Sequence, residues 1–136
     1  MEHGPQRWAA AVLTASLLAG PAWSSAARTV RLLYAHPDGV EGCPDEQQVR
    51  DAVSARLGYD PFQDAAQTTV SASIEPSGPG LLGHVVIRGE TGSTLGERHV
   101  ASRDRDCAEL AAAMILAISI AIDPLSAVAA EPQPPP

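Results

Sequence analysis

Two cysteines and two of the four histidines carry the clearest potential for chemistry in this 136-residue chain. Cys43 and Cys107 are its only cysteines, and each begins a segment typical of a helix start, Gly-Cys-Pro-Asp-Glu and Asp-Cys-Ala-Glu-Leu. A redox catalyst would usually carry Cys-x-x-Cys with an exposed, low-pKa thiol at a helix start. Here 64 positions separate the two cysteines, so we expect one structural disulfide. A redox or metal-binding pair is the alternative.

His84 and His99 lie in two segments that we expect to form neighbouring antiparallel strands. If Thr91-Gly92 forms a two-residue turn, the register places His84 directly opposite His99. Two cross-strand imidazoles with Glu97 beside them could bind Zn²⁺ or Cu²⁺. A one-residue bulge would destroy this geometry. The alternative is a pair of solvated histidines on the outer face of the sheet.

The same register turns Arg98, together with Val100, toward the expected helices. A buried guanidinium needs a carboxylate partner, which Asp106, Glu109 or Asp51 could supply. We therefore expect a structural ion pair, with a site for an anionic ligand as the alternative. Aspartates before and at a helix start are otherwise ordinary capping residues.

The rest of the chain shows no catalytic motif. It lacks Gly-x-Ser-x-Gly, His-Glu-x-x-His, a phosphate-binding glycine loop and a dinucleotide fingerprint. We therefore expect no catalytic residue, no cofactor and a non-enzymatic protein. The net charge is −7, all nine basic residues are arginine and they form no cluster, which argues against nucleic acid and anionic lipid as partners.

The N-terminal segment is typical of a secretory signal. Arg7 precedes a short apolar run from Trp8 to Ala19, and small residues suited to signal peptidase follow. We expect a signal peptide over 1–26, cleaved after Ala26 or Ala27, and a periplasmic or secreted product. An uncleaved anchor is the alternative.

A second apolar stretch runs from Leu110 to Ile122 and ends at Asp123-Pro124. As a helix from Cys107 it would be about 24 Å long, short of the roughly 30 Å hydrocarbon core of a bilayer. We therefore expect a buried helix, and no stable transmembrane segment after signal cleavage. A helix that leaves the core and enters lipid is the alternative.

Hydrophobic periodicity predicts a single α+β domain over 28–124, with the order β-α-β-β-β-α. We expect strands over 29–35, near 70–74, 82–88 and 95–101, and helices from Pro44 to Gly58 and over 107–122. The helices should cover one face of a mostly antiparallel sheet. The segment 125–136 is rich in proline and should be an extended, disordered tail, either a true end or a truncated linker.

The two cysteine-containing segments, "GCPDEQQVRDAVSARLGYDPF" and "GERHVASRDRDCAELAAAMILAISIAIDP", with the Pro-rich end, resemble a group of exported proteins of GC-rich, myxobacterial-type Gram-negative bacteria. The group has no assigned activity, so the resemblance implies an architecture and no site residues. The element order is also similar to small periplasmic domains such as the N-terminal domain of TolB, an analogy of fold alone.

These observations favour an exported, non-enzymatic module of the envelope or the exterior that binds a protein or envelope partner. The binding surface would be the helix-free sheet face, with Val86, Leu95, His84 and His99, or an open sheet edge. The alternatives are a metal-binding protein or enzyme using His84, His99 and Glu97, and a membrane-active protein using the 110–122 helix.

Overall fold

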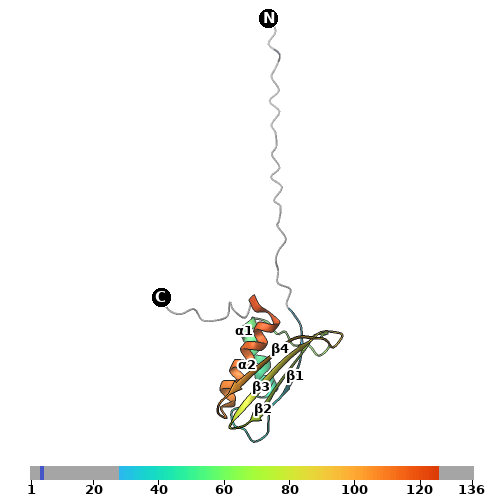
Figure 1. Ribbon diagram of the computed structural model, residues 1–136. Coiled ribbons are helices and arrows are strands. Elements are labelled where there is room, and N and C mark those ends of the chain that lie inside the picture. Colours follow the sequence, from blue (N-terminus) through green and yellow to red (C-terminus); the bar gives the residue numbers. More distant parts are fainter. Residues whose placement is uncertain (1–3, 5–27, 126–136) are drawn as a thin grey trace.

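The computed structural model describes Gly4 and residues 28–125. Two helices lie side by side on one face of a four-stranded sheet (Figure 1). The elements in chain order are β1 (Arg31–Ala35), α1 (Glu46–Leu57), β2 (Thr69–Ser77), β3 (Gly80–Arg88), β4 (Thr94–Ser102) and α2 (Cys107–Ile122). The predicted α+β class and the order β-α-β-β-β-α are confirmed. The signal peptide expected over 1–26, apart from Gly4, and the tail beyond Leu125 lie outside the described residues.

The sheet has the strand order β1-β2-β3-β4, so β1 and β4 are its edges. β1 and β2 are parallel and are connected through α1, while the other two pairs are antiparallel hairpins. β2 extends beyond the expected 70–74 and includes Pro76. β1 ends opposite Ser73, so none of the described strands lies beside Pro76 on that side and its missing N–H costs no ladder hydrogen bond.

Helix α1 begins at Glu46, two residues later than the expected Pro44. Asp45, which was expected inside the helix, is instead the residue before its first turn: its carboxylate accepts from the Gln48 N–H at 2.8 Å, and the Gln48 side chain accepts from the Asp45 N–H. This capping box satisfies two backbone donors that would otherwise lack partners. The helix ends where Gly58 adopts the left-handed conformation with φ 80°, as predicted.

The β3–β4 hairpin reaches the predicted register through a different turn. His84 pairs with His99, and Val85 with Arg98, as the two-residue turn required. However, the Gly89 N–H donates to the Ser93 carbonyl, which makes the loop one residue longer. A bulge between Ile87 and Arg88 then restores the register before it reaches the histidines.

The core lies between the sheet and the helices. Helix α2 contributes its buried residues at helical spacing, so the prediction that Leu110–Ile122 packs against the domain is confirmed; these residues are Leu110, Ala111, Met114, Ile118 and Ile122. Gly83 of β3 lets Met114 lie directly against the sheet, because a Cβ there would overlap the Met114 side chain and displace it. No helix among the described residues is long and apolar enough to cross a membrane.

Candidate functional site

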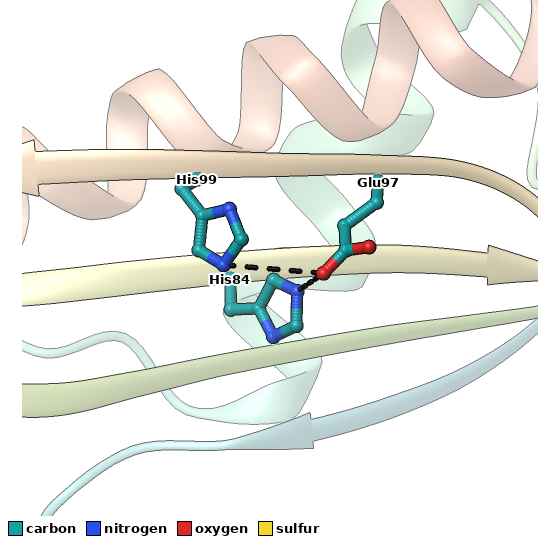
Figure 2. A group of neighbouring side chains, drawn as sticks. All are labelled: His84, Glu97 and His99. Atoms are coloured by element: carbon teal, nitrogen blue, oxygen red, sulfur yellow. Dashed lines mark hydrogen bonds and ion pairs between the residues drawn. The ribbon is translucent and has the colours of Figure 1, made fainter.

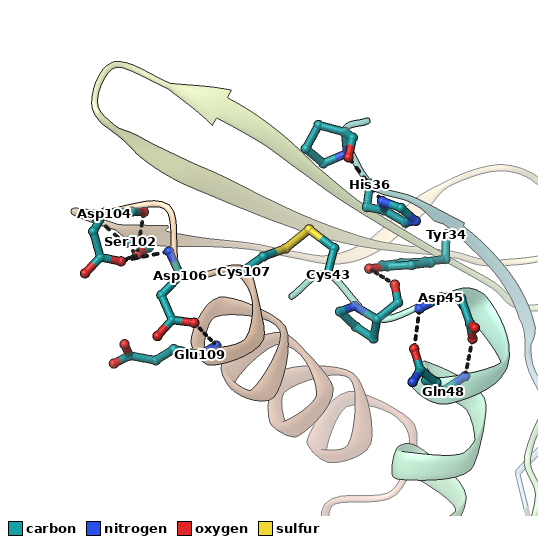
Figure 3. Close-up of a disulfide and its surroundings, with 12 residues drawn as sticks. Tyr34, His36, Cys43, Asp45, Gln48, Ser102, Asp104, Asp106, Cys107 and Glu109 are labelled. Atoms are coloured by element: carbon teal, nitrogen blue, oxygen red, sulfur yellow. Dashed lines mark hydrogen bonds between the residues drawn. A yellow bond between two sulfur atoms is a disulfide. The ribbon is translucent and has the colours of Figure 1, made fainter. Parts of the chain in front are cut away.

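The predicted disulfide between Cys43 and Cys107 is present and joins the starts of the two helices (Figure 3). The Cα atoms are 4.9 Å apart, within the usual range for a disulfide. Cys107 is fully buried in the core and Cys43 is partly buried against it. The bond is therefore placed to stabilise the fold.

Tyr34 lies beside this crosslink and connects β1 to the start of α1. Its hydroxyl donates to the Pro44 carbonyl at 2.9 Å (Figure 3). Partial burial raises the pKa of the phenol above 10.0, and the negative charge of Asp45 raises it further. Tyr34 therefore remains neutral and able to donate at physiological pH.

Arg98 does not form the expected ion pair. Although Arg98 and all three candidate partners are described, no ion pair joins Arg98 to Asp51, Asp106 or Glu109. Arg98 lies beside Ala117 of α2, whereas Glu109 lies eight residues earlier, about 12 Å along a helix axis. The Asp106 carboxylate instead accepts from the Glu109 N–H at 3.1 Å and caps α2 (Figure 3).

The second predicted group is brought together on the helix-free face. Figure 2 shows His84 of β3 with Glu97 and His99 of β4, all pointing toward one another. The His84 Nε2 atom is 2.6 Å from the Glu97 Oε1 atom, and His99 Nε2 is 3.9 Å from the same oxygen. The imidazole rings stack with centroids 4.2 Å apart and planes 6° from parallel.

These three side chains are accessible to solvent, with exposed fractions of 34% for His84, 48% for Glu97 and 56% for His99. One nitrogen or oxygen from each side chain lies within 4.8 Å of the others. Imidazole nitrogen and carboxylate oxygen are ligands of zinc and of neighbouring transition metals. The arrangement can therefore hold one such ion or a shared proton.

The edge of the sheet at β4 differs from the edge at β1. Val30, just before β1, exchanges backbone hydrogen bonds with the 61–63 segment, which covers the start of that edge. Within the described residues, β4 pairs with β3 alone over its nine residues. The backbone groups on its other side are therefore free to pair with an additional strand.

An apolar groove lies between this open edge and helix α2. The β4–α2 groove has a volume of about 200 Å³ and includes Ile87, Gly96, Arg98, Ala117, Ile120 and Ala121. A second groove of about 610 Å³ shares Ile87, Gly96 and Ala121 with it and continues to Leu95. Leu95 thus lies beside the end of α2, not on the helix-free face as expected, because the bulge shifts the alternation of β4.

The sequence prediction missed the helical side of this groove. Ala117, Ile120 and Ala121 were assigned to a buried helix, yet Ile120 is 39% exposed and Ala121 is exposed. The available signal was the lack of any charged residue between Glu109 and Asp123. A surface helix usually has a charged outer face, so a helix that is apolar on all sides needs cover from more than one side.

Comparison with known proteins does not assign this chain to a class: no protein family model matches it, and no curated protein matches its sequence.

Proposed function

We propose that the protein is a non-enzymatic module that acts outside the cytoplasm and binds an extended segment of another protein along the free edge of β4. The disulfide supports a location outside the cytoplasm, because such bonds persist mainly in oxidising compartments. The observation that carries the binding proposal is the open nine-residue edge of β4 next to the apolar β4–α2 groove.

A strand added at β4 would pair with the free backbone groups of the edge and would cover the apolar groove. Its backbone would pair with the free amide and carbonyl groups of β4, which gives affinity. Every second side chain would enter the groove and cover Ile120 and Ala121 of α2, which gives specificity for apolar residues at alternate positions. The partner segment should therefore alternate apolar and polar residues and contain no proline.

A second copy of this chain fits the same edge less well. In an antiparallel β4–β4 pair, the two Arg98 side chains would lie on the same face close to the symmetry axis, and like charges across strands destabilise pairing. The bulge beside Leu95 also twists the start of the edge. These features limit self-association while leaving the regular part of β4 available.

Peptides selected from a random library on the immobilised protein provide the test. We expect the selected peptides to alternate apolar residues and to slow hydrogen exchange of the β4 amides. Ile120→Glu should weaken their binding by at least about tenfold, because the new charge would be buried in the groove. Ala55→Glu places the same charge on the exposed face of α1 and should leave binding unchanged.

Three results would contradict the proposal: no peptide binds, bound peptides leave β4 exchange unaltered, or Ile120→Glu binds as well as the parent protein. Analytical ultracentrifugation of the protein alone tests whether a second copy of the chain occupies the β4 edge instead. A dimer that Ile120→Glu dissociates would assign the β4 edge to a second copy of the chain and overturn the proposed partner.

A further inference from the structure

His84, Glu97 and His99 occupy surface positions of the sheet that do not require histidine or glutamate for folding. The three side chains stand on the helix-free face, where serine and threonine are their ordinary neighbours: Ser73 on β2 lies directly beside His84. All three are at least one-third exposed, so none is needed to fill the core. Their nitrogen and oxygen atoms are therefore accessible to a ligand from solvent.

We propose that His84, Glu97 and His99 form a binding site for one divalent transition-metal ion of the zinc class. This inference goes beyond the strand-binding function and does not depend on it, because the two imidazoles stand on the helix-free face, and Glu97 alone also borders the β4–α2 groove. The site would supply two imidazole nitrogens and one carboxylate oxygen, with water completing the coordination shell.

The backbone geometry supports convergence of the three ligands. His84 and His99 are direct cross-strand partners, and Glu97 is two residues before His99 on the same face of β4. Ligands bound to one tetrahedral zinc ion at about 2.0–2.1 Å are about 3.3 Å from one another. The contacts to the Glu97 oxygen, 2.6 Å from His84 and 3.9 Å from His99, lie on either side of that spacing.

Two local changes would accompany binding. The stacked rings must fan apart so that their nitrogen lone pairs converge, which exposed side chains can do by rotation about χ1 and χ2. In the present contact the His84 Nε2 atom must be the donor, since a carboxylate oxygen only accepts. That proton must move to Nδ1 or leave before Nε2 can bind the metal.

The ligand set also indicates which cations should bind. Imidazole favours zinc, copper and nickel over magnesium and calcium, which prefer a shell of oxygen atoms. The single carboxylate provides one negative charge at the site, and the chain as a whole carries −7, so a cation is attracted. We therefore expect Zn²⁺ to bind and Mg²⁺ not to bind.

Titration of the full chain with ZnCl₂, followed by NMR of the histidine rings, tests the proposal. The imidazole signals of His84 and His99 should shift together and saturate at one equivalent of Zn²⁺, while His36, on the loop after β1, stays unchanged. Calorimetry should show one site, and His99→Ala should weaken it by at least about tenfold. His36→Ala is the matched control and should bind as the parent protein does.

Several outcomes would overturn the site. Zn²⁺ that leaves the His84 and His99 signals in place, or that shifts His36 equally, excludes specific binding by the cluster. Unchanged affinity in His99→Ala does the same. Because the NMR titration uses the unmodified protein, the test holds even if a variant fails to fold.

Discussion

Removal of the Cys43–Cys107 disulfide should cost this domain a large part of its stability. The bond closes a loop with a sequence separation of 64. The chain-entropy relation for a loop of that length gives about 4 kcal/mol at room temperature. Domains of this size are typically stable by about 5–15 kcal/mol, so the loss would leave a weakly stable protein.

Urea unfolding of the double variant Cys43→Ala/Cys107→Ala, followed by circular dichroism, measures this loss. Alanine is preferred to serine because Cys107 is fully buried and a hydroxyl there would lack a partner. Each single variant should lose about as much stability as the double variant, since either substitution removes the whole crosslink. The dependence of unfolding free energy on urea should also become steeper, because the denatured chain expands further without the crosslink.

Reduction of the parent protein provides the control. Dithiothreitol should lower the stability of the parent protein to about that of the double variant and should leave the double variant unchanged. A loss below about 2 kcal/mol in the double variant would refute the reasoning. It would mean that the denatured chain is already as restricted as the crosslinked one.

Two further substitutions test the packing of the sheet and the phenol beside the disulfide. Gly80→Ala should destabilise the domain by about 1–3 kcal/mol in urea unfolding, because its Cβ would overlap the backbone carbonyl of Ser102. Tyr34→Phe should cost about 1 kcal/mol at neutral pH by removing the hydrogen bond to Pro44. Since the folded-state pKa of Tyr34 is raised above 10.0, its stabilising contribution is present below pH 10.0 and is lost as the pH rises through the folded value. Stability should therefore fall less steeply above pH 10.0 in Tyr34→Phe than in the parent protein.

Matched controls separate these effects from general sensitivity to substitution. Gly96→Ala also adds a methyl group to a strand glycine, but its nearest neighbour is 3.9 Å away, so it should change stability little. Equal losses for Gly80→Ala and Gly96→Ala would contradict the steric argument. An alkaline stability profile that Tyr34→Phe leaves unaltered would contradict the proposed role of the phenol.

Local patterns in the sequence predict most of the elements. The apolar spacing of Val49, Val53 and Leu57 followed by Gly58 specifies helix α1, and the alternation of Val70, Ala72 and Ile74 specifies β2. Such patterns succeed because burial on one face imposes a period on the chain. The predicted start of α1 was two residues early, because Pro44 suits a first helical position but the capping box of Asp45 and Gln48 begins the helix at Glu46.

The two candidate sites differ in how much the sequence could predict. His84, Glu97 and His99 were grouped correctly because strand register follows from a hairpin, although the turn itself was wrong. The longer loop and the bulge are each one residue in size and opposite in effect, so they cancel before the histidines. The predicted ion pair of Arg98 was wrong. Strand register shows which face of the sheet Arg98 lies on, but it does not show which turn of helix α2 lies opposite that residue.

By itself, the sequence determined the element order, the pairing of the only two cysteines and the face on which the histidines stand. The order and the face follow from the local hydrophobic periodicity, and two cysteines allow a single pairing. Only the tertiary structure decided that β4 is an open edge and that α2 leaves Ile120 exposed beside it. Strand order and helix placement depend on how separate elements share one core. The residue type of an apolar side chain such as Ile120 does not show whether it is buried in the core or exposed on a binding surface.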